Sequence, residues 1–228
     1  MSIKSFIKMS LTDWDEKVSA VLFLGGCNYR CPYCHNWQIV ESPDGVDDVP
    51  LDEVKAYLKE SASWLDGVVI TGGEPTQDPE LLTLAAYIKS LGLQVKLDTN
   101  GSEPDVLEEL IGRHLVDYIA MDVKNSFGKY AETVGTLPDL DDVKKSIEIV
   151  MDFAAHEFRT TVVPDLVEEE DIVKICGYLR GAQRYILQRY HPENVLNKEY
   201  AEIMPQRDDE MEHLVSLCEG KVPVTWRG

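Results

Sequence analysis

The sequence contains no apolar run long enough to cross a membrane. Its longest apolar stretch without a charged residue, Val18–Tyr29, has 12 residues, whereas a membrane-spanning helix needs about 20. The first ten residues carry Lys4 and Lys8 but lack the apolar core of a signal peptide. We therefore expect a cytoplasmic protein with no membrane partner.

Basic residues are also scarce, because 22 Lys and Arg face 41 Asp and Glu, which gives a formal net charge of −19. Nucleic-acid binding relies on a basic surface, so we expect no nucleic-acid partner. Aromatic residues make up only 8% of the chain, but hydrophobic residues reach 44%. This hydrophobic content is typical of a folded protein and excludes general disorder.

No linker, repeat or low-complexity segment divides the 228 residues, which are enough for one sizeable core. Short β-branched and aliphatic runs alternate with segments of helical periodicity, so we expect βαβ units around a parallel sheet. The sheet is either doubly wound or an incomplete α/β barrel. The predicted strands are Val18–Leu24, Gly67–Ile70, Gln94–Leu97, Tyr118–Met121, Phe158–Val163 and Tyr185–Leu187, with Phe6–Leu11 and Val222–Thr225 as possible additions, and the predicted helices include Asp52–Lys59, Asp105–Arg113 and stripes starting at Leu81, Val143 and Ile172.

Residues of unusual chemistry follow the predicted strands. Ligands of α/β sheets and barrels bind at the carboxyl ends of the strands, so we expect these residues to line one rim. They are the segments Gly25–Cys34, Thr71–Pro75, Asp98–Gly101, Asp122–Lys124, Val163–Pro164 and Gln188–His191.

Three of the five cysteines, Cys27, Cys31 and Cys34, lie within eight residues at the spacing C-x3-C-x2-C. Thiolates favour zinc or iron–sulfur clusters. A structural zinc takes four protein ligands and an ordinary cluster takes four cysteines, and no fourth ligand is evident near this loop. The spacing therefore predicts a cluster with one iron open to an exogenous ligand.

Two other interpretations of this loop remain open. Cys31-Pro-Tyr-Cys34 is also the active-site pattern of glutaredoxin-like dithiol proteins, and a zinc-binding module would use the same thiolates. A glutaredoxin fold needs about half this length and explains neither Cys27 nor the Gly-Gly-Glu run. Cys176 and Cys218 lie in apolar helical contexts, so we expect them to be buried free thiols.

The cysteine spacing, with Tyr33 before the third cysteine, resembles the signature of the radical S-adenosylmethionine (SAM) superfamily. Thr71–Pro75 resembles its Gly-Gly-Glu motif. Cys34–Asn36, Asp98–Gly101, Asp122–Lys124 and Arg159–Pro164 resemble the activating enzymes of glycyl-radical proteins, including pyruvate formate-lyase activases and anaerobic ribonucleoside-triphosphate reductase activating proteins. The resemblance runs from about Phe6 to Pro192. It implies a partial (β/α)6 TIM-like barrel of parallel strands with helices outside, in a single domain over residues 1–228 with a core at about 17–192 and a C-terminal helix and strand within 207–226.

The resemblance also implies one [4Fe–4S] cluster that reductively cleaves SAM to a 5′-deoxyadenosyl radical. This radical would take a hydrogen from a glycine of a partner, the anaerobic ribonucleoside-triphosphate reductase, with a flavodoxin or ferredoxin as electron donor. A radical SAM enzyme acting on a small molecule, like 7-carboxy-7-deazaguanine synthase, is the alternative. The implied metal ligands are Cys27, Cys31 and Cys34, joined as catalytic residues by Asp122 and Lys124, and the implied cofactor-binding residues are Tyr33, Asn36, Gly72, Gly73, Glu74, Thr99, Asn100, Asp122, Lys124, Arg159 and His191.

Overall fold

The computed structural model describes all residues from 1 to 228, and their contacts form two compact units. The chain passes from one unit to the other after Asn28, His35, Thr99, Ser102 and Ile119. The expected single domain over residues 1–228 stays a prediction. Unit 1 consists of Met1–Asn28, Asn36–Thr99 and Glu103–Ile119, and unit 2 consists of Tyr29–His35, Asn100–Ser102 and Ala120–Gly228.

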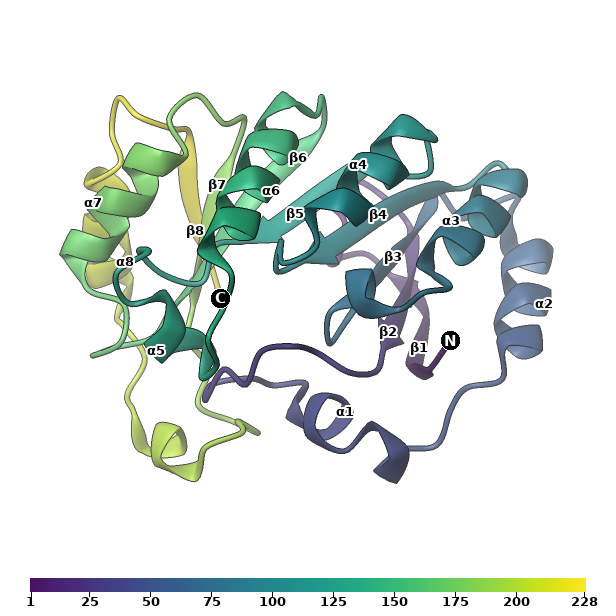
Figure 1. Cartoon of the computed structure of the whole chain (residues 1–228), viewed down its shortest axis with the longest axis horizontal. Helices are drawn as coiled ribbons and strands as arrows, with labels where there is room; N and C mark the ends of the chain where they lie inside the picture. The colour runs from purple at the N-terminus through teal and green to yellow at the C-terminus, as the bar shows by residue number, and fades with distance from the viewer. The chain divides into compact units, whose positions relative to one another are not determined.

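Unit 1 contains four strands that are neighbours in chain order, followed by the start of a fifth. The first strand is antiparallel to the second, and the next pairs are parallel. The indole of Trp14 packs against Val21 and Val69 on one face of the sheet, and helices cover the other face (Figure 1). The elements are β1 (Ile3–Ser10), β2 (Ser19–Leu24), β3 (Gly67–Gly72), β4 (Gln94–Thr99), α1 (Trp37–Glu41), α2 (Leu51–Ser61), α3 (Leu81–Ser90) and α4 (Pro104–Gly112).

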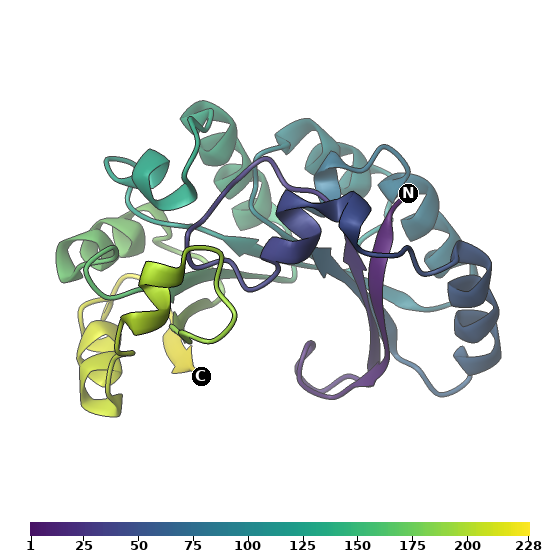
Figure 2. The same cartoon turned by 90° about the horizontal axis from the view of Figure 1, so that it is seen from below.

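Unit 2 continues from β5 (Tyr118–Asp122), the strand that both units share. Val123, just after β5, donates a backbone hydrogen bond to Arg159 in β6, and the following strands pair in parallel. Figure 2 shows the C-terminal helix beside the last strand. The other elements are β6 (His156–Val162), β7 (Tyr185–Arg189), β8 (Val224–Arg227), α5 (Tyr130–Val134), α6 (Leu140–Asp152), α7 (Glu169–Tyr178) and α8 (Asp208–Ser216).

The order of the strands decides between the two sheet types left open by periodicity. A doubly wound sheet reverses its strand order at a switch point, whereas here the order runs from β1 to β8 without a reversal. The fold is therefore α/β with parallel strands, helices outside and the strand order of a partial TIM-like barrel. All six main predicted strands are confirmed, with ends shifted by a few residues, and the two additional strands are present as β1 and β8.

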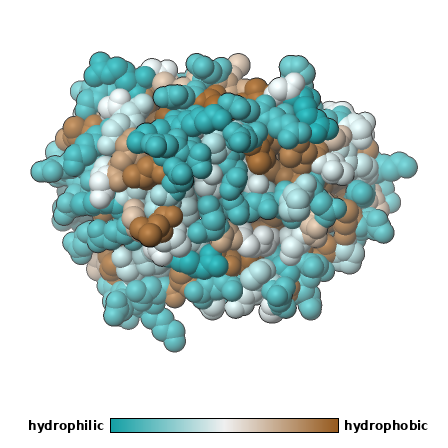
Figure 3. Space-filling view, in the orientation of Figure 1, coloured by the Kyte–Doolittle hydropathy of each residue, from teal (hydrophilic) through white to brown (hydrophobic).

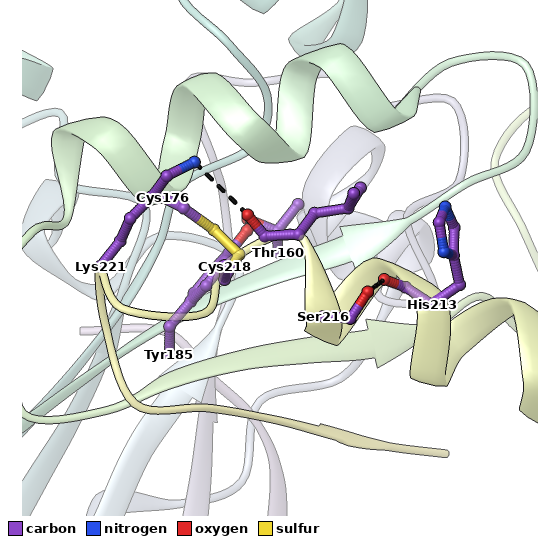
Figure 4. Close-up of a disulfide and its surroundings, with 8 residues drawn as sticks. Thr160, Cys176, Tyr185, His213, Ser216, Cys218 and Lys221 are labelled. Atoms are coloured by element: carbon purple, nitrogen blue, oxygen red, sulfur yellow. Dashed lines mark hydrogen bonds between the residues drawn. A yellow bond between two sulfur atoms is a disulfide. The ribbon is translucent and has the colours of Figure 1, made fainter.

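The expectation that Cys176 and Cys218 are free thiols is wrong. The two residues form a disulfide, with their Cα atoms 5.5 Å apart, and Figure 4 shows it between α7 and the segment that follows α8. Both residues are fully buried, as expected. They are 42 residues apart in the sequence, and their pairing depends on the packing of these two segments, which periodicity does not reveal.

The surface agrees with the acidic composition. The face in Figure 3 is largely hydrophilic, with hydrophobic residues in scattered patches. No helix of the structure combines the length and apolar character needed to span a bilayer.

Candidate functional site

In unit 1, the loops after β2 and β3 touch through their backbones. Gly73 N donates a 2.9 Å hydrogen bond to Leu24 O, and Glu74 N donates a 2.8 Å bond to Gly26 O. Gly72 has φ +118°, and a Cβ there would lie 2.5 Å from the backbone of Leu24. Only glycine fits this conformation and this approach. The Gly-Gly pair therefore shapes the loop, and its contact with SAM stays a prediction.

The carboxylate of Glu74 is buried and joins two strand ends. Its Oε1 accepts hydrogen bonds from Thr76 N at 3.1 Å, Thr76 Oγ1 at 2.6 Å and Thr99 Oγ1 at 2.7 Å. Glu74 is 1% exposed and Thr99 is 3% exposed. These two predicted cofactor-binding side chains thus contact each other and hold the loops after β3 and β4 together.

Asn36 and Asn100 also have structural partners. Asn36 Nδ2 donates a 2.7 Å hydrogen bond to Gly72 O, which ties the start of α1 to the glycine loop. In unit 2, Asn100 Oδ1 accepts a 2.9 Å bond from Ser102 N, the pattern of an Asx turn. The predicted contacts of both asparagines with a cofactor are not tested by these bonds.

In unit 2, Asp122 lies between two cations. Lys124 Nζ is 2.8 Å from Asp122 Oδ2, and Arg159 Nε is 2.8 Å from Asp122 Oδ1. Burial alone would raise the pKa of Asp122, but the charges of Arg159 and Lys124 outweigh it and hold that pKa well below its usual range. The same pairing raises the pKa of Lys124 although burial opposes the shift. Both side chains are therefore ionised at neutral pH.

Tyr33 lies in the electrostatic environment of this ion pair. Its ring is 5% exposed, and its hydroxyl has no hydrogen-bond partner. Burial, followed by the neighbouring Cys31, raises the pKa of Tyr33 well above its usual value, while Lys124 opposes this shift. In unit 2, Cys31, Asp122 and Lys124 thus act electrostatically on Tyr33. The buried hydroxyl of Tyr33 is a hydrogen-bond donor for which the chain itself provides no partner.

None of the three cysteines of the loop forms a disulfide. Cys27 belongs to unit 1, whereas Cys31 and Cys34 belong to unit 2, where Cys34 N donates a 3.0 Å hydrogen bond to Cys31 O. No group of three His, Cys, Asp or Glu side chains forms a metal-binding arrangement in the structure. The three thiols are nevertheless soft ligands of the kind that iron–sulfur clusters take, one fewer than the four of an ordinary cluster.

Sequence reasoning gave no role to several residues that contact the cysteine loop. Asn197 N donates a 2.9 Å bond to Pro32 O, and Asn194 Nδ2 donates a 3.3 Å bond to His35 O. His191 was a predicted cofactor contact, and its backbone oxygen instead lies 2.8 Å from His35 Nε2. Asparagine in a loop after a strand is the only sequence signal, and it is too common to identify these contacts.

Comparisons with known proteins show what the chain is similar to. A model of the Radical SAM superfamily matches residues 21–178. The chain is 36% identical over 223 residues to a Methanocaldococcus jannaschii protein named "Putative glycyl-radical enzyme activating enzyme", covering 95% of this chain and 91% of the other. It is 27% identical over 203 residues to the pyruvate formate-lyase-activating enzyme of Clostridium pasteurianum, covering 83% of this chain and 82% of that enzyme.

Solved structures show the same fold. A domain of pyruvate-formate lyase-activating enzyme from Bacteroides vulgatus matches with a TM-score of 0.57 at 17% identity, covering 71% of this chain and 99% of that domain. Streptococcus suis SuiB matches with a TM-score of 0.65 at 16% identity, covering 90% of this chain. The chain spans about half of SuiB, because the match covers 47% of that protein.

Proposed function

Because this chain belongs to the radical SAM superfamily and is an enzyme of its glycyl-radical-activating type, we propose that it installs a glycyl radical in an anaerobic ribonucleoside-triphosphate reductase. The observation that carries the proposal is the 36% identity to the M. jannaschii protein, which extends over 95% of this chain. The choice of reductase as the partner rests on the overall resemblance of the sequence, from about Phe6 to Pro192, to the activating proteins of that reductase.

Enzymes of this superfamily use a [4Fe–4S] cluster and SAM. When bound and reduced, these cofactors supply a 5′-deoxyadenosyl radical, and the protein supplies binding and orientation. The residues fit such a group, because thiolates are the soft ligands that iron–sulfur clusters take and Cys27, Cys31 and Cys34 are not in a disulfide. In our proposal the thiolates of Cys27, Cys31 and Cys34 would hold the cluster and would leave one iron open to SAM.

The remaining residues would orient SAM. Gly72 and Gly73 would contact SAM through the backbone of their loop, whose shape depends on their close contact with the backbone of Leu24 and Gly26. The raised pKa of Lys124 keeps its ammonium charged, so we propose that it pairs with the SAM carboxylate while Asp122 fixes its position. Tyr33 would place its buried ring against the adenine and its unpartnered hydroxyl near the ligand.

A glycine residue is a sensible acceptor for the radical. Removal of a hydrogen atom from its Cα leaves a radical that the adjacent amide nitrogen and carbonyl group stabilise. The connections Asp44–Pro50 and Asn125–Asp139 are short and hold only small helical elements. Such short connections suit the entry of a loop from a partner protein better than a closed pocket for a small molecule. A flavodoxin or ferredoxin would supply the electron.

The decisive experiment mixes the anaerobically reconstituted, reduced enzyme with SAM and a co-encoded glycyl-radical candidate. A glycine-centred doublet in electron paramagnetic resonance, with one 5′-deoxyadenosine formed per radical, is the expected result. Cys31→Ala should abolish both signals, whereas Glu60→Ala, at an exposed helix position, should retain them. Formation of 5′-deoxyadenosine without a doublet for any candidate would favour a small-molecule substrate.

Two further outcomes would contradict the proposal that the chain binds a [4Fe–4S] cluster. A colourless protein that binds only zinc would indicate a zinc-binding module. Efficient reduction of a mixed disulfide by the iron-free protein would indicate a glutaredoxin-like dithiol. We expect neither, because about four irons per chain should be retained after reconstitution.

A further inference from the structure

The segment Tyr29–His35 belongs to unit 2, although the chain on both sides of it belongs to unit 1. It carries two of the three proposed cluster ligands, Cys31 and Cys34. Its attachment to unit 2 includes a 2.7 Å hydrogen bond from Arg30 N to Val134 O. Gly135, beside Val134, has φ +65°, and a Cβ there would lie 2.5 Å from Arg30 O. The backbone near Cys31 is therefore held closely on this side.

The other attachment comes from residues 191–197, which we call the bracing segment. Its three hydrogen bonds reach the two residues that flank the Tyr33–Cys34 pair. Asn197 N donates to Pro32 O at 2.9 Å, and Asn194 Nδ2 donates to His35 O at 3.3 Å. His35 Nε2 donates to the carbonyl oxygen of His191 at 2.8 Å. Cys34 thus lies between two points that are fixed to the same segment.

The bracing segment is itself held at its ends and its centre. Tyr190 Oη donates a 2.6 Å hydrogen bond to Tyr200 O, which closes the chain on either side of the segment. Val195 is 7% exposed and anchors the middle. Asn194 has φ +56°, a left-handed conformation that asparagine tolerates better than most residues. The segment is therefore preorganised to hold its donors toward the cysteine loop.

We propose that the bracing segment positions the Cys34 thiolate for cluster binding and that Asn194 and His35 are the positioning residues. The inference rests on the proposed function, since it requires a cluster on the cysteine loop. A thiolate held by its backbone at both sides samples fewer orientations, so the Cys34–iron bond breaks less often. Asn194, more than 150 positions from the cysteine loop in the sequence, would thereby control how long the cluster stays intact.

The test compares iron release from the reconstituted full-length chain. Asn194→Gly removes the side-chain donor and still permits the positive φ, and His35→Ala removes the second contact. Asn197→Ala is the matched control. The Asn197 side chain accepts a bond from Glu199 N, two residues further along the chain, and only the backbone N–H of Asn197 reaches the cysteine loop. His35→Gln restores a donor at position 35. Circular dichroism verifies that each variant is folded.

We expect iron transfer to an excess of ferrous chelator to be about 3- to 10-fold faster in Asn194→Gly and His35→Ala, the range set by loss of one hydrogen bond. Asn197→Ala should match the wild type, and His35→Gln should recover part of the loss. The g-values of the reduced cluster should also shift in the first two variants, which a general loss of stability would not cause. If Asn194→Gly and His35→Ala both release iron at the wild-type rate and give the wild-type spectrum, the inference about the bracing segment is wrong, but the proposed function is not affected. A wild-type chain that takes up no iron would overturn the proposed function as well.

Discussion

The hydroxyl of Thr99, at the end of β4, donates a 2.7 Å hydrogen bond to Oε1 of Glu74, in the loop after β3. Two residues that the sequence places 25 positions apart thus form one buried contact. Glu74 also receives two bonds from Thr76. The acidic residue of the Gly-Gly-Glu run therefore organises the rim of unit 1, whatever the run binds.

Replacement of Glu74 should destabilise unit 1. Glu74→Ala leaves Thr76 and Thr99 without their buried acceptor, which should lower the free energy of unfolding by about 2–3 kcal/mol. Urea unfolding of the iron-free chain measures this loss independently of any cofactor. Glu60→Ala, on an exposed helix position, should change it by less than about 0.5 kcal/mol. Equal stability of the two variants would show that Glu74 does not hold the loops after β3 and β4 together.

A methyl group at Gly73 should disrupt cofactor binding. The Cβ of Gly73→Ala would collide with the carbonyl oxygen of Gly26, and this backbone atom cannot move away without shifting the loop before Cys27. We expect SAM affinity of the reconstituted chain to fall at least about tenfold, equivalent to ~1.4 kcal/mol, by isothermal titration calorimetry. Gly177→Ala provides the control, since a Cβ there meets nothing within 4 Å. Unchanged affinity in Gly73→Ala would rule out a close approach of ligand at this loop.

The low pKa of Asp122 should make stability depend on pH. Because its pKa in the folded state lies below the ordinary value of 3.8, the ionised carboxylate stabilises the fold above that value. This contribution is lost as the pH falls through and below about 4. Asp122→Asn should therefore be less stable than the wild type at pH 7, and the difference should shrink between pH 5 and pH 3. Urea midpoints at several pH values measure it, and a pH-independent difference would argue against the ion pairs with Lys124 and Arg159.

The disulfide between Cys176 and Cys218 predicts how many thiols of the unfolded chain react before and after reduction. Of five cysteines, three are free, so the iron-free chain unfolded without reductant should show three reactive thiols, and five after reduction. Cys218→Ser should lower the free energy of unfolding by about 2–4 kcal/mol, the range for loss of a cross-link. Thiol titration and urea unfolding give the two values. Five reactive thiols before reduction would show that Cys176 and Cys218 are unpaired.

Local patterns in the sequence predicted most of the fold. The strands β2, β3, β5 and β7 have runs of buried apolar residues, and α3 shows the expected stripe of Leu81, Leu84, Ala85 and Ile88. The segment Asp122–Lys124 was predicted to follow a strand, and it lies at the end of β5, where the two charged side chains form an ion pair. The helix α1 was not predicted because it is short and buries only Val40.

Contacts between distant residues could not be predicted in this way. The ion pair of Arg159 with Asp122, 37 positions away, was not predicted, and the predicted contact of Arg159 with a cofactor stays a prediction. Asn194 and His35 are 159 positions apart, and Cys176 pairs with Cys218 across 42. Each contact depends on which loops the fold places together, and neither hydrophobic periodicity nor cysteine spacing records that.

The five crossings of the chain between its units have a practical consequence for anyone who wishes to dissect the protein. No single cut yields both units intact, because Tyr29–His35 is encoded within the N-terminal part and folds with the C-terminal part. A cut after Ile119 would leave the C-terminal fragment without Cys31 and Cys34, which belong to its unit. Fragment expression would therefore have to be replaced by complementation of two co-produced pieces or by circular permutation.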